Sequence, residues 1–151
     1  RYLRITDFRS DEDMRFIPKM EQDVYCTEKD LLMIRYGGTA SELVTGKAGI
    51  FHNNMFRIDF DKRLINRDLL KKYLSLFVIR KELLTGSTSS TMPQISHKVM
   101  NGIKMPLPPL NEQHRIVDKF VELLEFCDQM KSQITNAKKY QTKIADSLTQ
   151  L

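Results

Sequence analysis

The stretch Pro106-Leu107-Pro108-Pro109-Leu110-Asn111-Glu112-Gln113-His114-Arg115-Ile116-Val117 divides the sequence into two parts of different character. Its three prolines exclude a central strand and end any preceding helix, because proline has no amide hydrogen to donate. Neither proline nor glycine occurs again before Leu151. Asn111 is a suitable N-cap and Glu112 suits a first helical turn. The sequence therefore predicts one uninterrupted helix over 111–151, of about 40 residues and roughly 60 Å.

Apolar residues recur along this predicted helix at alternating spacings of four and three. The eleven positions are Ile116, Phe120, Leu123, Cys127, Met130, Ile134, Ala137, Gln141, Ile144, Leu148 and Leu151. A 3.5-residue repeat keeps one seam facing a partner helix, which is typical of a coiled coil. A rod of about 60 Å outreaches a globule of some 110 residues, roughly 26–30 Å across. We therefore expect a second helix from elsewhere to cover the seam.

Gln141 is the polar exception among the eleven positions. A polar residue in a coiled-coil core weakens the seam locally but can fix register or orientation by pairing with another polar group. The alternative is that the last third of the helix is frayed and exposed. The sequence leaves both open.

Residues 1–110 have the pattern of a mixed, β-rich domain. Between Tyr2 and Gly49, short apolar clusters broken by turn residues predict strands and loops, with Leu31–Ile34 as one strand. Alternation of apolar and polar residues over 56–61 predicts a half-buried strand. The stretch 85–92 is rich in Ser, Thr and Gly and predicts a loop.

One helix is predicted after Asn66, which can cap it. Its apolar positions, at helical spacing, are Leu69, Leu70, Tyr73, Leu74, Phe77 and Val78, and Gly86 lies beyond its end. We expect this helix to pack against the sheet. The predicted class is α+β: a mixed β-rich domain with packed helices over 1–110, and a long coiled-coil helix over 111–151.

The net charge of +5 is unevenly distributed. Residues 112–151 hold six basic and six acidic residues, whereas residues 31–111 hold twelve basic against five acidic. A polyanion is the natural partner of such a stretch. The alternative is an ordinary solvated surface, since many proteins of similar charge bind no nucleic acid.

The sequence lacks membrane-spanning segments, a secretory signal and paired cysteines. No run of 18 apolar residues occurs, and the first residues lack the apolar stretch of a secretory signal, so we expect a cytoplasmic protein with no membrane contact. Cys26 and Cys127 form no Cys-x-x-Cys pair. We expect both to be buried apolar residues rather than parts of a disulfide or zinc site.

The sequence carries no pattern for catalysis. Pro108-Pro109 is flanked by leucines and lacks the Asn/Asp and aromatic neighbours of an adenine methyltransferase motif, and no glycine-rich cofactor loop is present. The stretch 37–48 lacks the first glycine and final Ser/Thr of a phosphate-binding loop. His52-Asn53-Asn54 has no Glu-x-Lys partner for a metal nuclease, and His97 and His114 lack a metal-ligand spacing. We expect no metal, no cofactor and no catalytic residue in this chain.

The remaining polar residues of the basic domain suit DNA binding. Side chains that can bond phosphates or base edges lie in predicted loops: Arg35, Tyr36, Thr39, Lys47, Ser89, Ser90 and Gln94. Among these we expect Arg35, Tyr36, Thr39 and Gln94 to contact bases. The lysines and arginines of 31–111 are expected to contact phosphates.

The stretch Pro106–Val117 closely resembles a known junction. Its Pro-Pro, Glu-Gln and Ile-Val pairs are those with which type I restriction-modification specificity subunits leave a target recognition domain and enter their spacer helix. Three further stretches stand in the family's order: Tyr2-Leu3-Arg4-Ile5-Thr6-Asp7, Leu32-Met33-Ile34-Arg35-Tyr36-Gly37-Gly38-Thr39 and Met92-Pro93-Gln94-Ile95-Ser96. Together these matches cover essentially the whole chain.

The chain departs from the family in two places. Family domains usually have a further segment before the first match, so we expect the recognition domain to be incomplete at its N-terminus. The family pattern continues after Gly-Gly-Thr with a short Gly-Lys-like turn, whereas here 40–45 intervene before Gly46-Lys47.

The resemblance implies a subunit without catalysis. In the family, two recognition domains each read half of a bipartite DNA site, and paired antiparallel helices hold them apart. Methyltransferase subunits dock on those helices and bring S-adenosylmethionine, and restriction subunits bring ATP and Mg²⁺. This chain resembles half of such a subunit, so in isolation we expect an antiparallel homodimer.

Two other functions are compatible with the sequence. The recognition region of a fused restriction-methylation enzyme would share the domain and differ in what precedes it. A coiled-coil adaptor without DNA binding would explain 112–151, but it leaves the basic excess and the ordered motifs before Pro106 unexplained.

Overall fold

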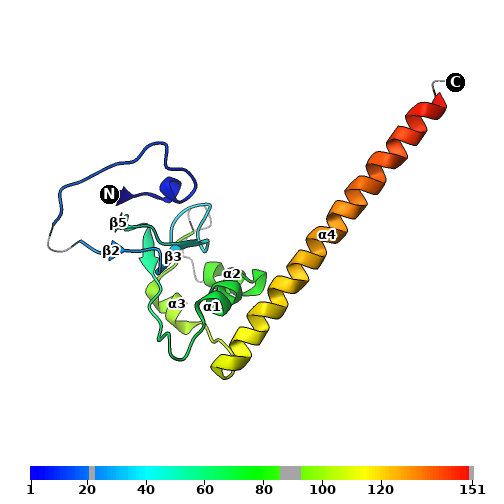
Figure 1. Cartoon of the computed structure of the whole chain (residues 1–151). Helices are drawn as coiled ribbons and strands as arrows, with labels where there is room; N and C mark the ends of the chain where they lie inside the picture. The colour runs from blue at the N-terminus through cyan, green and yellow to red at the C-terminus, as the bar shows by residue number, and fades with distance from the viewer. Residues whose placement is uncertain (21–22, 86–92, 150–151) are drawn as a thin grey trace. The chain divides into compact units, whose positions relative to one another are not determined.

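The computed structural model of the chain describes residues 1–20, 23–85 and 93–149, with side chains as far as Asp146. The chain divides into two compact units, Arg1–Leu110 and Asn111–Leu151. The first unit contains two small sheets and several helices, and the second is a single helix (Figure 1). The predicted α+β class is confirmed.

Two three-stranded sheets form the β part of the first unit. One has the order β1 (Tyr2–Leu3), β5 (Gly49–Phe51), β2 (Tyr25–Cys26), with β1 parallel and β2 antiparallel to β5. The other is antiparallel, with the order β4 (Leu43–Thr45), β3 (Leu31–Ile34), β6 (Met55–Arg57).

Strand β3 is the centre of the domain, because all four of its side chains are buried. Side chains alternate along a strand, so Leu31 and Met33 point to one side and Leu32 to the other. Leu31 and Met33 belong to the larger core, which also contains residues of the helices. Leu32 belongs to a smaller core with Leu3 and Cys26. The strand therefore holds both sheets and the helices together, and the predicted burial of Cys26 is confirmed.

The strand predicted over 56–61 is shorter than expected, since β6 ends at Arg57. The Ile58 amide still donates to the Leu31 carbonyl at 2.8 Å. The pairing with β3 ends there, because β3 itself begins at Leu31. The apolar residues of the predicted alternation, Phe56, Ile58 and Phe60, nevertheless all belong to the larger core or pack against it.

The single helix predicted after Asn66 is two helices, α1 (Arg67–Leu74) and α2 (Phe77–Thr85). They are separated at Ser75, whose hydroxyl donates to the Lys71 carbonyl at 2.7 Å. Hydroxyls that bond back to the preceding turn compete with the helical backbone. Because the direction changes there, the prediction that Phe77 and Val78 pack on the sheet is wrong, and both are exposed. Their places in the core are taken by Ile79 and Leu83.

The predicted cap of α1 is confirmed. The Asn66 side chain accepts hydrogen bonds from the amides of Asp68, at 2.8 Å, and Leu69, at 3.0 Å. We expect Asn66→Ala to lower the free energy of unfolding by about 1 kcal/mol, because two helical amides lose their acceptor. Asn66→Asp keeps the acceptor oxygen and is the control. Urea unfolding of the three proteins measures the effect, and an equal loss in both variants would contradict it.

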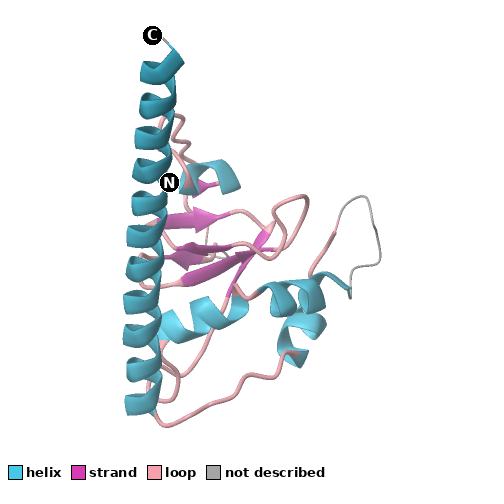
Figure 2. Ribbon diagram, turned by 90° about the vertical axis from the view of Figure 1, so that its right-hand side faces the viewer, coloured by secondary structure: helices cyan, strands magenta, loops and turns pink. Residues whose placement is uncertain are grey.

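Two short helices had no counterpart in the sequence prediction. One is a 3₁₀ helix, η1 (Ile5–Phe8), and the other is α3 (His97–Gly102), capped by Ser96, whose hydroxyl accepts from the Val99 amide at 3.2 Å. The sequence signal for α3 is Ser96, a suitable N-cap, followed three positions later by the apolar pair Val99-Met100. The helices α1, α2 and α3 gather at one end of the two sheets (Figure 2). Of the loop predicted over 85–92, Thr85 is the last residue of α2 and 86–92 lie outside the described residues.

The helix α4, Leu110–Thr149, has 40 residues and forms the described part of the second unit, with its first residue in the first unit; it confirms the predicted long helix. It begins one residue before the predicted cap, so Asn111 lies inside the helix rather than at its N-cap. Proline is tolerated at or before a first helical turn because its missing amide hydrogen would have no partner there, and Pro109 allows this early start. Among the described residues, no helix is long and apolar enough to cross a membrane.

Candidate functional site

The candidate base-contacting residues gather where β3 ends. The segments around Arg35 and Gln94 run antiparallel, with a bridge between Tyr36 and Gln94. The Ile95 amide donates to the Arg35 carbonyl at 2.9 Å, and the Gly37 amide donates to the Pro93 carbonyl at 3.1 Å. Ile95 is fully buried and anchors this second segment in the larger core.

Three side chains of these segments form what we term the Tyr36 cluster: Arg35, Tyr36 and Gln94. The Gln94 amide nitrogen donates to the Tyr36 hydroxyl at 2.8 Å. The Arg35 guanidinium carbon lies 4.9 Å from the centre of the Tyr36 ring, within the range of a cation–π contact. All three residues are partly exposed. Arg35 forms no ion pair with any acidic side chain in the part of the chain that the structure describes.

Thr39 lies in the tight turn that follows the Tyr36 cluster. Gly37 has a φ of 82°, in the left-handed region that favours glycine. The Ala40 amide donates to the Gly37 carbonyl at 3.0 Å, and the Glu42 amide donates to the Thr39 carbonyl at 3.0 Å. Thr39 is half-buried within this turn. The structure thus keeps the turn close to Tyr36 in space as well as in sequence.

A contact from α2 supports the same turn. Ser41 is buried with a φ of 74°, a conformation that costs energy in a residue other than glycine. Its hydroxyl accepts a hydrogen bond from the Arg80 Nε at 3.0 Å. This bond connects the turn to α2.

The structure places Lys47 elsewhere, beside the N-terminal segment. Its amino group donates to the Asp7 carbonyl at 2.6 Å and to the Asp11 carboxylate at 2.8 Å. Lys47 is therefore occupied in holding the segment that follows η1. Of the other candidates, Ser89 and Ser90 lie outside the described residues.

Asp7 is the buried acid of this segment. Burial raises the pKa of its carboxyl group, but hydrogen bonds from the side chain and amide of Arg4, with the charges of Arg4 and Arg1, outweigh burial and leave that pKa below its ordinary value of 3.8. The Arg4 amide and Nε both donate to the same carboxylate oxygen, at 2.8 and 3.0 Å. The ionised carboxylate therefore stabilises the fold.

A depressed pKa makes this stabilisation depend on pH. It is fully present above the ordinary value of 3.8 and is lost as pH falls through the lower value of the folded protein. We expect Asp7→Asn to lower the free energy of unfolding by about 1–3 kcal/mol at neutral pH, with a smaller difference from the unsubstituted protein below pH 3.8. Urea unfolding at several pH values measures this. Asp118→Asn on α4 is the control, and a constant difference across pH would contradict the prediction.

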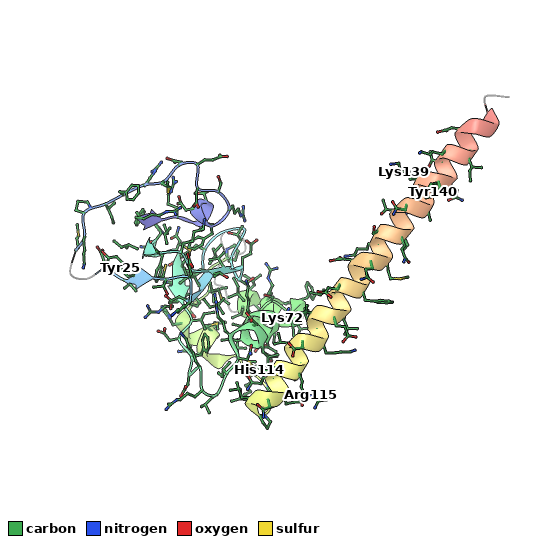
Figure 3. The ribbon with its side chains drawn as sticks, viewed as in Figure 1. Tyr25, Lys72, His114, Arg115, Lys139 and Tyr140 are labelled. Carbon is green, nitrogen blue, oxygen red and sulfur yellow. The ribbon has the colours of Figure 1, made fainter. Side chains whose placement is uncertain are left out.

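The helix α4 exposes its heptad seam. Of the seam positions, Ile116, Phe120, Leu123, Met130, Ile134 and Ile144 are between 39% and 61% exposed. Cys127 is exposed as well, so the prediction that it is buried is wrong for this chain. Every described side chain from Asp118 to Asp146 is exposed, and Lys139 and Tyr140 are among those that project from the helix (Figure 3). Ala137 and Gln141 share this exposure, whereas the side chains of Leu148 and Leu151 lie outside the described residues.

Comparison with known proteins identifies the family. The family model described as the type I restriction modification DNA specificity domain matches residues 2–140. The chain belongs to this family. The resemblance proposed from the Pro106–Val117 stretch is thereby confirmed.

Individual relatives of this specificity domain carry consistent names. The type I restriction enzyme MjaVIII specificity subunit of Methanocaldococcus jannaschii is 28% identical over 142 residues, covering 91% of this chain and 33% of the relative. The EcoKI specificity subunit of Escherichia coli K12 is 27% identical over 152 residues, covering 89% of this chain and 32% of the relative. The chain therefore spans about a third of the length of these relatives.

The basic excess of the specificity domain lies mostly in the helical stretch 62–85. None of the candidate DNA-binding residues predicted individually from the sequence lies in that stretch. Residues 62–85 contain seven basic and two acidic residues, whereas residues 31–61 contain three of each. Lys72 is one of these basic residues and lies on α1 (Figure 3). Charge counted in shorter windows would have pointed to this region. Among the described residues, no group of three or more His, Cys, Asp or Glu side chains is arranged to hold a metal ion.

Proposed function

We propose that this specificity domain recognises DNA sequence, reading one half of a bipartite site. The observation that carries the proposal is the Tyr36 cluster, within a chain whose relatives are named specificity subunits of type I restriction enzymes. Backbone pairing holds polar side chains from two distant segments close together there. Base recognition needs side chains that are held in a fixed geometry.

The chemistry of the Tyr36 cluster suits base edges. An arginine can donate two hydrogen bonds to guanine, and a glutamine can bond adenine through its amide. The Tyr36 hydroxyl accepts from Gln94 and so orients that amide. Thr39, in the adjoining turn, supplies a hydroxyl that can bond either a base or a phosphate. Lysines and arginines of 31–111 then fix the domain on the phosphates.

The helix α4 acts in this proposal as spacer and docking arm. Its exposed seam supports antiparallel pairing with a second spacer helix, supplied by another copy when the chain is isolated. Two recognition domains would then stand at a distance set by helix length. Methyltransferase subunits dock on the paired helices, and restriction subunits join the complex. Catalysis, with S-adenosylmethionine, ATP and Mg²⁺, belongs to those partners.

Selection from random duplexes tests the proposal. The chain, with its methyltransferase subunit added, is mixed with a pool of random DNA, and the retained DNA is sequenced at two salt concentrations. Phosphate attraction falls steeply with salt, so a motif that persists at high salt reflects base contacts. We expect a split, symmetric motif with a fixed gap. Random retained DNA at both salts, although the added subunit binds, would support the adaptor function instead.

A further inference from the structure

The junction between α1 and α2 carries an apolar protrusion. Leu76, Phe77 and Val78 are 46%, 80% and 70% exposed. Exposed apolar residues that occur singly are ordinary, but three in succession, one of them a phenylalanine, mark a contact surface. The core below is filled by Ile79 and Leu83, so packing of the domain does not require these three side chains.

A hollow of about 560 Å³ lies beside Phe77. The described residues that line it are Ser75, Phe77, Arg80, Lys81, Leu84 and Thr85. This volume falls within the range of sites that bind small organic groups, roughly 300–1,000 Å³. No acidic side chain is among these lining residues. The hollow thus combines an aromatic ring with two cations.

The electrostatic surroundings favour an anion. Residues 62–85 contain seven basic and two acidic residues. Among the described residues, Lys71, Arg80 and Lys81 form no ion pair with an acid. Phe77 is also the first residue of α2, a helix of nine residues, where unpaired amides add partial positive charge.

We propose that this hollow is a second DNA contact of the domain, distinct from the Tyr36 cluster. Arg80 and Lys81 bind the phosphates on either side of a nucleotide, whose sugar packs on the Phe77 ring. The inference rests on the proposed function, because it assumes that DNA is the ligand of the domain. A polyanion fits the hollow because both of its described charged lining residues are basic and the surrounding stretch 62–85 contains five more basic than acidic residues.

The fold connects this hollow to the Tyr36 cluster. Arg80 lines the hollow and also bonds Ser41, in the turn that follows Tyr36. The Arg80–Ser41 bond therefore links the hollow to the turn beside the Tyr36 cluster. DNA that occupies the hollow fixes the orientation of the domain, and the Tyr36 cluster then reads bases from that position.

Two variants test the proposal in the full chain assembled with its methyltransferase subunit. Phe77→Ala should weaken DNA binding roughly tenfold, because the apolar contact between the ring and one sugar is lost. Lys81→Gln should reduce the slope of log affinity against log salt by about one, because one phosphate contact is lost. Phe16→Ala, at a phenylalanine 71% exposed, and Lys29→Gln, at an exposed lysine, are matched controls.

The possible results separate this inference from the proposed function. If Phe77→Ala and Lys81→Gln bind DNA like their controls while Tyr36-cluster variants lose sequence discrimination, the hollow is not a DNA contact and the proposed function stands. If the two variants lose the methyltransferase subunit but not DNA, the hollow is a protein interface and the inference is overturned. If the unsubstituted complex binds no DNA, both fail. Unchanged thermal unfolding and circular dichroism confirm that the variants are folded.

Discussion

Ile134→Asp is expected to abolish pairing of α4 with a second helix. Ile134 lies on the heptad seam and is 53% exposed in the single chain. Pairing would bury it against the facing helix, so an aspartate there loses apolar burial and forces a charge from water. We estimate a cost of at least about 3 kcal/mol, which raises the dissociation constant of the pair more than a hundredfold. Sedimentation equilibrium of the isolated chain measures it.

Ser132→Asp is the matched control for this prediction. It introduces the same side chain two residues away, on the side of the helix opposite the seam. Circular dichroism should show similar helix content in both variants, since each places one aspartate in a helix interior. A single chain mass for the unsubstituted protein at all concentrations would remove the homodimer hypothesis. Equal association of the two variants would mean that the seam is not the pairing surface.

Gln94→Ala is expected to lower the preference of the complex for its recognition site over random DNA. The Gln94 amide is oriented by the Tyr36 hydroxyl at 2.8 Å, and a bidentate amide contact to a base is worth about 1–3 kcal/mol. We therefore expect the preference for the selected site over random DNA to fall roughly tenfold to a hundredfold. Affinity for random DNA at low salt should change little, because phosphate contacts carry it.

Tyr36→Phe tests whether the Tyr36 hydroxyl orients the Gln94 amide or contacts a base itself. It removes the hydroxyl that bonds Gln94 and leaves the ring beneath the Arg35 guanidinium. An intermediate loss of discrimination is expected if the hydroxyl only orients the amide. Gln129→Ala, on α4, is the control for the loss of an exposed glutamine. If Gln94→Ala and Gln129→Ala discriminate sites equally well, Gln94 does not read a base.

The features that were predictable from sequence are those decided by neighbours along the chain. The 40 residues of α4 follow from the absence of proline and glycine after Pro109, and its seam follows from a 3.5-residue repeat. Asn66 caps α1 because a side-chain oxygen reaches amides two and three positions ahead. Strand β3 was recognisable as an apolar run ending near glycines. The family was recognisable from the proline junction.

Tertiary structure decided how distant residues meet. Tyr36 and Gln94 are 58 positions apart, and their hydrogen bond exists because the segments around them pair. Lys47 turned toward Asp11, 36 positions away, where sequence composition had suggested a phosphate contact. The break at Ser75 turned Phe77 outward and placed Ile79 and Leu83 in the core.

The physical reason for this division is the range of the interactions involved. Helix repeats and caps depend on bonds within four residues, so composition and spacing determine them directly. The binding surface depends on side chains brought together by closing long loops, and many sequences with the same local patterns would close them differently. The sequence alone therefore determined the long helix, the family, strand β3 and the cap of α1. Which polar groups face one another, and which apolar ones remain exposed, was fixed only by packing around β3.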